Sequence, residues 1–102
     1  MHSIEKQVDQ LLINANQALN FLSAVLDDLI LKKEQLTYVS QKKLIESLQK
    51  YRKNKAALTN IKNLINKAQY PLSEKLRSHI SRNLRARISA IIEEAIELDK
   101  VR

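Results

Sequence analysis

Hydrophobic side chains recur along this chain at the spacing of one helix face, in three separate stretches. The first stripe repeats about every 3.5 residues, as in packed helices, and contains Ile4, Val8, Leu11, Ala15, Ala18, Leu22, Val25 and Leu29. The second stripe contains Leu44, Leu48, Tyr51, Leu58, Ile61, Ile65 and Ala68. The third contains Leu76, Ile80, Leu84, Ile88, Ile91, Ala95 and Leu98. No alternating run or hairpin dipeptide indicates a strand, so the pattern predicts an all-α fold.

Two turns are expected between these helices. Tyr70 precedes Pro71, the single proline, and is therefore disfavoured in the helical region, while Ser73 is suited to cap the next helix. The earlier turn is less clearly marked, and Thr37 or Ser40 is its candidate cap.

The length of 102 residues corresponds to a single domain, residues 1–102. We predict an antiparallel helical bundle with three long helices, or four if the first helix breaks near Asn20-Ser23. The chain contains no glycine, the residue that sharp turns and phosphate-cradling loops use most. Active sites built on such loops are therefore not expected.

The charge of the chain is unevenly distributed. Residues 32–87 contain fifteen Lys and Arg against three Glu, whereas residues 1–31 and 88–102 are net acidic, and the whole chain carries a formal charge of +7. A basic middle between acidic ends either pairs within the bundle or attracts an acidic partner.

The basic residues singled out as partner-binding candidates are Lys50, Arg52, Lys53, Arg77, Arg82 and Arg85. Arginines spaced three and eight residues apart share a helix face, which is suited to phosphates along a nucleic acid. A solvated or internally paired basic face, an acidic protein and an anionic membrane surface are the other interpretations.

A second set of candidates widens the apolar face of the first helix, namely Leu12, Leu19, Phe21, Leu26 and Ile30. Either this helix is central in the bundle, or part of the face forms a groove for an amphipathic helix or a homodimer contact.

Residues suited to catalysis or metal binding are sparse. Ser78 and His79 are adjacent on a helix and point in different directions, and His2 lies near the chain start. The carboxylates Glu93, Glu94, Glu97 and Asp99 lack the Glu-x-x-His pairs of carboxylate metal bundles. We expect them to form a solvated acidic helix end that faces the basic segment of a neighbouring helix. We therefore expect neither an enzyme nor a bound metal or cofactor.

Features of localisation favour the cytoplasm. The chain has no cysteine, begins with charged residues where a secretory signal is apolar, and has Asp27 and Asp28 within its longest apolar stretch. No membrane span is expected from this pattern.

Between Leu22 and Leu58, a leucine-rich helix turns into a second helix with spaced leucines and basic residues, at Leu29–Leu36, Val39, Lys43, Leu44, Ile45, Leu48 and Arg52. This stretch resembles the N-terminal half of FlgN-type flagellar export chaperones. This resemblance implies a cytoplasmic escort that binds a terminal helix of an export substrate.

The whole chain is also similar to bacteriocin immunity proteins in its size, charge and glycine-poor helicity. The pair Leu72-Ser73, which opens a helix after a short loop, fits the start of their last helix. This similarity implies a four-helix bundle that protects a toxin-producing cell. Both resemblances favour a bundle that binds protein through exposed helix faces.

Overall fold

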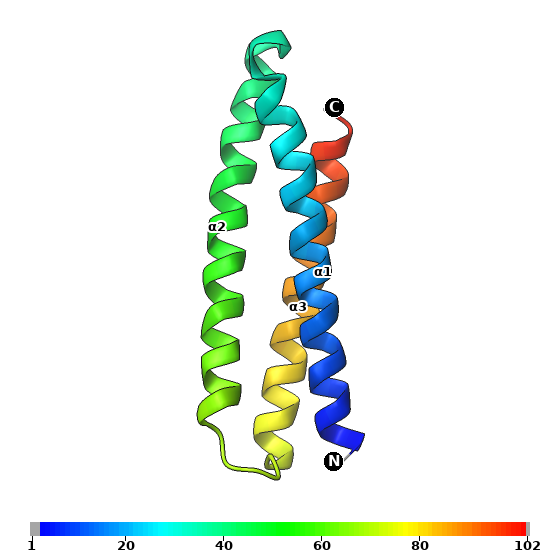
Figure 1. The fold of residues 1–102 in the computed structure, drawn as a ribbon, viewed down its shortest axis with the longest axis vertical. Coiled ribbons are helices and arrows are strands. Elements are labelled where there is room, and N and C mark those ends of the chain that lie inside the picture. The colour runs from blue at the N-terminus through cyan, green and yellow to red at the C-terminus, as the bar shows by residue number, and fades with distance from the viewer. Residues whose placement is uncertain (1–2, 102) are drawn as a thin grey trace.

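Three long helices form an elongated bundle in the computed structural model, which describes residues 3–101 (Figure 1). The elements are α1 (Ser3–Leu31), a short 3₁₀ helix η1 (Lys33–Gln35), α2 (Tyr38–Lys67) and α3 (Glu74–Asp99). The described chain contains no strand, and its dimensions are 52 × 18 × 17 Å. The predicted all-α fold with three helices is confirmed.

The first helix is continuous through Asn20-Ser23, so the alternative with four helices is wrong. The buried stripe explains this continuity, because Leu22 is buried in the core and the residues on both sides of it keep the same face inward. A break there would interrupt packing along that face.

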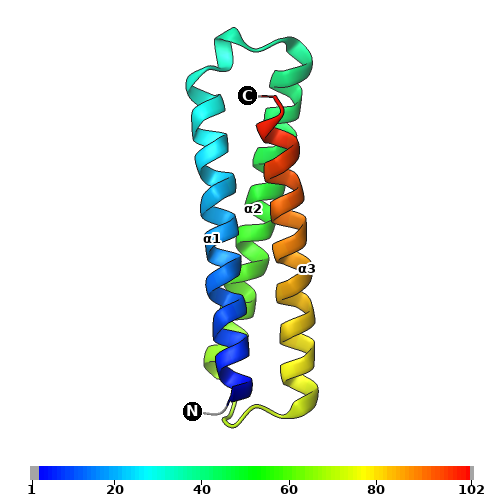
Figure 2. The ribbon, with the colours of Figure 1, turned by 90° about the vertical axis from the view of Figure 1, so that its right-hand side faces the viewer.

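The helices run up, down and up, so that α1 and α3 are parallel and α2 is antiparallel to both (Figures 1 and 2). The first helix packs more extensively on α3 than on α2. The start of α1 and the end of α3 consequently lie at opposite ends of the bundle.

The core follows the three predicted stripes. Its buried apolar members are Val8, Ala15, Ala18, Leu19, Leu22, Val25, Leu26, Leu29, Leu44, Leu58, Ile65, Leu72, Ile80, Leu84, Ile91, Ala95 and Leu98. The other stripe positions are half-buried against this core, except Ile4, whose side chain lies outside the described residues. Burial of these stripes is the main favourable contribution to the fold.

Side-chain caps start the second and third helices at predicted residues. Thr37 Oγ1 accepts a hydrogen bond from the Ser40 backbone N–H at 3.1 Å, and Ser73 Oγ accepts from the Leu76 N–H at 3.2 Å. The connection between α1 and α2 is further stabilised by Gln41, whose side-chain amide donates to the backbone carbonyls of Lys33 and Leu36. Polar side chains thus satisfy turn groups in a chain without glycine.

Candidate binding surfaces

An open cavity of about 420 Å³ lies between α1 and α3. Its lining consists of Gln7 from α1 and, from α3, Arg77, Ser78, Ser81, Arg82 and Arg85. We call it the arginine cavity. The three arginines that sequence periodicity placed on one face therefore all line one cavity, and each of its described lining residues has a polar side chain.

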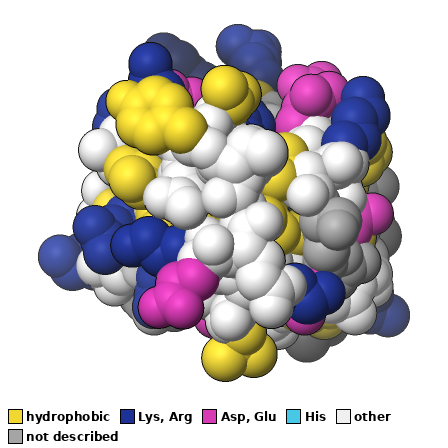
Figure 3. Space-filling model, turned by 90° about the horizontal axis from the view of Figure 1, so that it is seen from above, with side chains coloured by type: hydrophobic (Ala, Val, Ile, Leu, Met, Phe, Trp, Pro, Cys, Tyr) yellow, Lys and Arg dark blue, Asp and Glu magenta, His cyan; other side chains and the backbone are white. Residues whose placement is uncertain are grey.

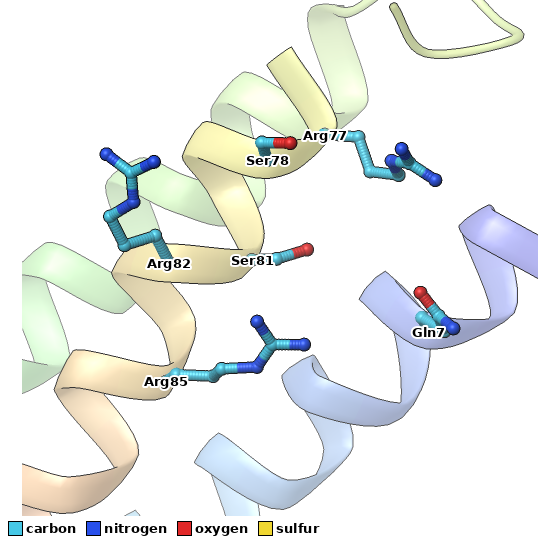
Figure 4. A pocket seen from close by; sticks show the side chains of 6 residues that line it. All are labelled: Gln7, Arg77, Ser78, Ser81, Arg82 and Arg85. Carbon is cyan, nitrogen blue, oxygen red and sulfur yellow. The ribbon is translucent and has the colours of Figure 1, made fainter. Parts of the chain in front are cut away.

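The arginine cavity has an inner and an outer part (Figure 4). Arg77, Ser81 and Arg85 follow one another at intervals of four residues and project toward Gln7 on α1. Arg82 leaves α3 in another direction, since consecutive helical residues are rotated by about 100°. Two guanidinium groups thus flank the Ser81 hydroxyl on the side that faces α1.

The lining groups of the arginine cavity are not engaged in the bundle. Among the described residues, the ion pairs are Lys32–Asp28, Lys43–Glu94, Lys50–Glu94 and Lys100–Glu97, and none involves a lining arginine. The nearest acid along α3, Glu74, is exposed in its first turn and does not line the cavity. The cavity therefore combines positive charge with unused hydrogen-bond donors.

The interface between α2 and α3 shows the opposite arrangement, in which charges are paired internally. Glu94 of α3 is only 7% exposed, and its carboxylate accepts hydrogen bonds from the Ser47 hydroxyl, from Lys43 Nζ at 3.0 Å and from Lys50 Nζ at 3.1 Å. The predicted solvated acidic end is correct for Glu93, Glu97 and Asp99, which are exposed, but wrong for Glu94, which is buried against the basic residues of α2. Lys50 is accordingly engaged in the bundle and is not a free cation.

The pKa of Glu94 reflects two opposing effects. Burial disfavours the carboxylate and raises its pKa, but the hydrogen bonds from Ser47, Lys43 and Lys50 and the charge of Lys43 lower it, and the net pKa is below the ordinary value. Glu94 is therefore ionised at neutral pH and acts as a charged link between α2 and α3.

A second polar contact lies further along the same interface. Arg87 donates to the side-chain oxygen of Asn54, which is buried on α2, at 3.1 Å. The two remaining basic candidates of α2, Arg52 and Lys53, are exposed and make no ion pair within the described part of the chain. Arg52 and Lys53 thus remain available on the surface.

The apolar candidates of α1 differ in their exposure. Leu19 and Leu26 are buried in the core, so the expectation that they are exposed for a partner is wrong. Leu12 is half-buried against the core. Phe21 is 49% exposed and Ile30 is similarly exposed. Leu19 and Leu26 are buried because α1 packs against both α2 and α3, and its wide apolar face is used for the two contacts.

A more exposed apolar surface lies at the turn between α1 and α2, where Ile30 was a predicted candidate but Leu31, Tyr38 and Val39 were not. Leu31, Tyr38 and Val39 are 86%, 82% and 75% exposed, the largest values among the described large apolar residues. Together with Ile30 they form what we call the apolar end. Seen from above, hydrophobic groups lie on this end of the bundle among Lys and Arg side chains (Figure 3).

A cavity of about 360 Å³ adjoins the apolar end and is lined by residues 30–35. The signal in the sequence was the placement of Leu31, Tyr38 and Val39 beside the predicted turn, outside the three stripes. Residues beside a turn have no facing helix to cover them, whereas the same residue types within a stripe are covered.

The candidates for catalysis and metal binding are placed as follows. The ring of His79 lies beside the Asn83 amide, with Nε2 and Nδ2 3.2 Å apart, and His2 lies outside the described residues. No group of three or more potential ligands among His, Cys, Asp and Glu comes together in the described chain. Within that same range, no helix has an apolar segment long enough to cross a membrane.

Comparisons of the chain with models of protein families, with curated proteins and with solved structures found no match.

Proposed function

We propose that this protein is a non-catalytic bundle that binds another protein through its exposed helix faces. The observation that supports the proposal is the apolar end, where Leu31, Tyr38 and Val39 are exposed although the core is closed without them. Clustered exposed apolar side chains are typical of surfaces that a partner covers.

The particular role we propose is that of a cytoplasmic export chaperone. The stretch that resembles FlgN-type chaperones, Leu29–Leu36 with Val39, includes most of the apolar end. An amphipathic helix of a cargo protein is a suitable occupant, because its apolar face covers such side chains and polar residues at its rim meet the flanking lysines.

A photo-crosslinking amino acid at Tyr38 tests the proposal in cells that produce the protein. We expect it to capture one protein, and the same crosslinker at Ala56, which is exposed on α2 away from the apolar end, serves as the control. The double variant Leu31→Asp and Val39→Asp should abolish capture while its helicity and unfolding temperature stay unchanged. Equal capture from both positions, or none, would contradict the proposal.

The identity of the captured protein distinguishes the named roles. A secreted or flagellar component supports the chaperone, whereas a toxin or its membrane receptor supports the alternative, a bacteriocin immunity protein. An immunity protein also protects a sensitive cell in which it is expressed, which a chaperone does not.

Binding of nucleic acid is the further alternative, which the unpaired Arg52 and Lys53 on α2 and the arginines of α3 favour. Such binding weakens with salt at a log–log slope of about −0.9 per phosphate contacted on duplex DNA, whereas apolar docking tolerates salt. A salt titration of duplex binding separates the two.

A further inference from the structure

We propose that the arginine cavity is a binding site for a phosphate group in its dianionic form. This inference is independent of the protein partner proposed above, because the apolar end lies in another part of the molecule.

The donors of the inner part are arranged around one position. Arg77 and Arg85 are separated by about 12 Å along the helix axis, at about 1.5 Å per residue, with Ser81 midway between them. Both long side chains project to the side that faces α1, and the Gln7 amide lies across from them (Figure 4). An anion beside the Ser81 hydroxyl is thus within reach of a guanidinium group on either side along α3 and of the Gln7 amide across from it.

The type of charge on these donors favours a phosphate. Guanidinium groups present pairs of N–H donors in a planar fork that matches phosphate oxygens, and they stay charged at every physiological pH. Two such groups supply two positive charges, equal to the charge of a dianionic phosphate. A carboxylate or a phosphodiester carries one negative charge, which leaves one of these arginines uncompensated.

The shape of the tetrahedral anion supports the same choice. A phosphate accepts hydrogen bonds from several directions, and the inner donors come from two helices and from three levels of α3. Among the described lining residues, none has an aromatic or aliphatic side chain on which a base or an apolar ligand group would rest. The cavity therefore suits the phosphate itself more than a large organic body attached to it.

The electrostatic surroundings act in the same direction. Among the described residues, no carboxylate lines the cavity. The cavity is open to solvent, so salt screens these interactions, and binding is best measured at low ionic strength.

The test is calorimetric titration of the full chain with inorganic phosphate and with pyrophosphate at low ionic strength. We expect saturable binding of one ion per chain, weakened at least tenfold in the double variant Arg77→Ala and Arg85→Ala. Lys75→Ala is the matched control, since it removes one exposed positive charge from the same helix at a position that does not line the cavity. This control should change the affinity by less than threefold.

Two further variants separate a fitted site from general positive charge. The double variant Arg77→Lys and Arg85→Lys keeps both charges but removes the forks, and we expect it to bind pyrophosphate several-fold more weakly. Glu74→Gln removes the nearest acid on α3 and should strengthen binding slightly. Circular dichroism and thermal unfolding confirm that each variant folds; equal affinity in the native protein and in the double alanine variant would overturn the proposal.

The source of the phosphate is distinguished by competing ligands. A nucleoside monophosphate that binds as well as inorganic phosphate shows that a terminal phosphate on a larger molecule is accepted, and a weaker nucleotide shows that the free ion is preferred. Acetate or citrate that binds as tightly as pyrophosphate would overturn the assignment to phosphate. The assignment would also be overturned if a single-stranded oligonucleotide without terminal phosphate bound more tightly than pyrophosphate and lost affinity in the variant Arg52→Ala. The ligand would then be a nucleic-acid backbone.

Discussion

Lys43 and Glu94 lie 51 residues apart in the sequence and are joined by an ion pair of 3.0 Å between Nζ and Oε1. Lys50 and Ser47 bind the same carboxylate, so that one α3 residue is held by three residues of α2. Because α1 packs more on α3 than on α2, this cluster is a specific polar link that attaches α2 to the other two helices.

Removal of Glu94 is expected to destabilise the fold. Glu94→Ala leaves the buried Ser47 hydroxyl and two lysines without their acceptor, and the free energy of unfolding should fall by about 1–3 kcal/mol. Chemical denaturation followed by circular dichroism measures this change. Glu93→Ala, at the exposed neighbouring position, is the control and should stay within about 0.5 kcal/mol of the native protein.

The same carboxylate should make stability dependent on pH. The pKa of Glu94 is lowered in the folded protein, so its contribution is fully present above the ordinary carboxyl pKa and is lost as the pH falls through the folded pKa. The difference in unfolding free energy between the native protein and Glu94→Gln should therefore be constant near pH 6 and shrink below about pH 4. A difference that grows on acidification would contradict this account.

The two helix caps should contribute separately. Thr37→Ala and Ser73→Ala each remove a side-chain acceptor at a helix start, and each should lower the unfolding free energy by about 1 kcal/mol. The caps lie at opposite ends of the bundle, so the double variant should show the sum. Ser89→Ala, at an exposed position within α3, should not destabilise the protein.

Buried and exposed positions on the apolar face of α1 should differ in how much their substitution lowers the free energy of unfolding. Leu26→Ala creates a cavity in the core and should cost about 2–5 kcal/mol, whereas Phe21→Ala affects a half-exposed ring and should cost markedly less. Thermal and chemical unfolding of both variants measure the contrast. Equal losses would indicate that Phe21 is covered in solution, as in a homodimer, and sedimentation measurements would then detect the dimer.

The helices and most of the core could be predicted because they depend on local sequence. A stripe such as Leu76 to Leu98 specifies one buried face, and Ser73 marks a helix start whatever lies next to it. Thr37 was one of two candidate caps at the earlier turn, and the structure selects it. The pairing of Ser47 with Glu94 could not be predicted, since it depends on how far α2 is shifted along α3. Nothing local in the sequence determines that shift.

The candidate sites were predicted less completely for a related reason. Grouping of Arg77 and Arg85 follows from the period of one helix, but the contribution of Gln7 requires the parallel packing of α1 on α3. Likewise, the width of the apolar arc on α1 does not indicate which edge faces α2. Leu26 is therefore buried and Phe21 exposed, although both widen the same stripe.

The parallel arrangement of the first and third helices makes the bundle a spacer. Whatever is joined ahead of α1 is held about 40 Å from whatever is joined behind α3, which is the length of the 26 residues of α3 at about 1.5 Å per residue. Copies of this chain linked head to tail would extend as a rod, whereas an antiparallel bundle with an even number of helices has both chain ends at the same end. Fluorescent labels attached to the two ends would therefore report folding as a fixed, long separation.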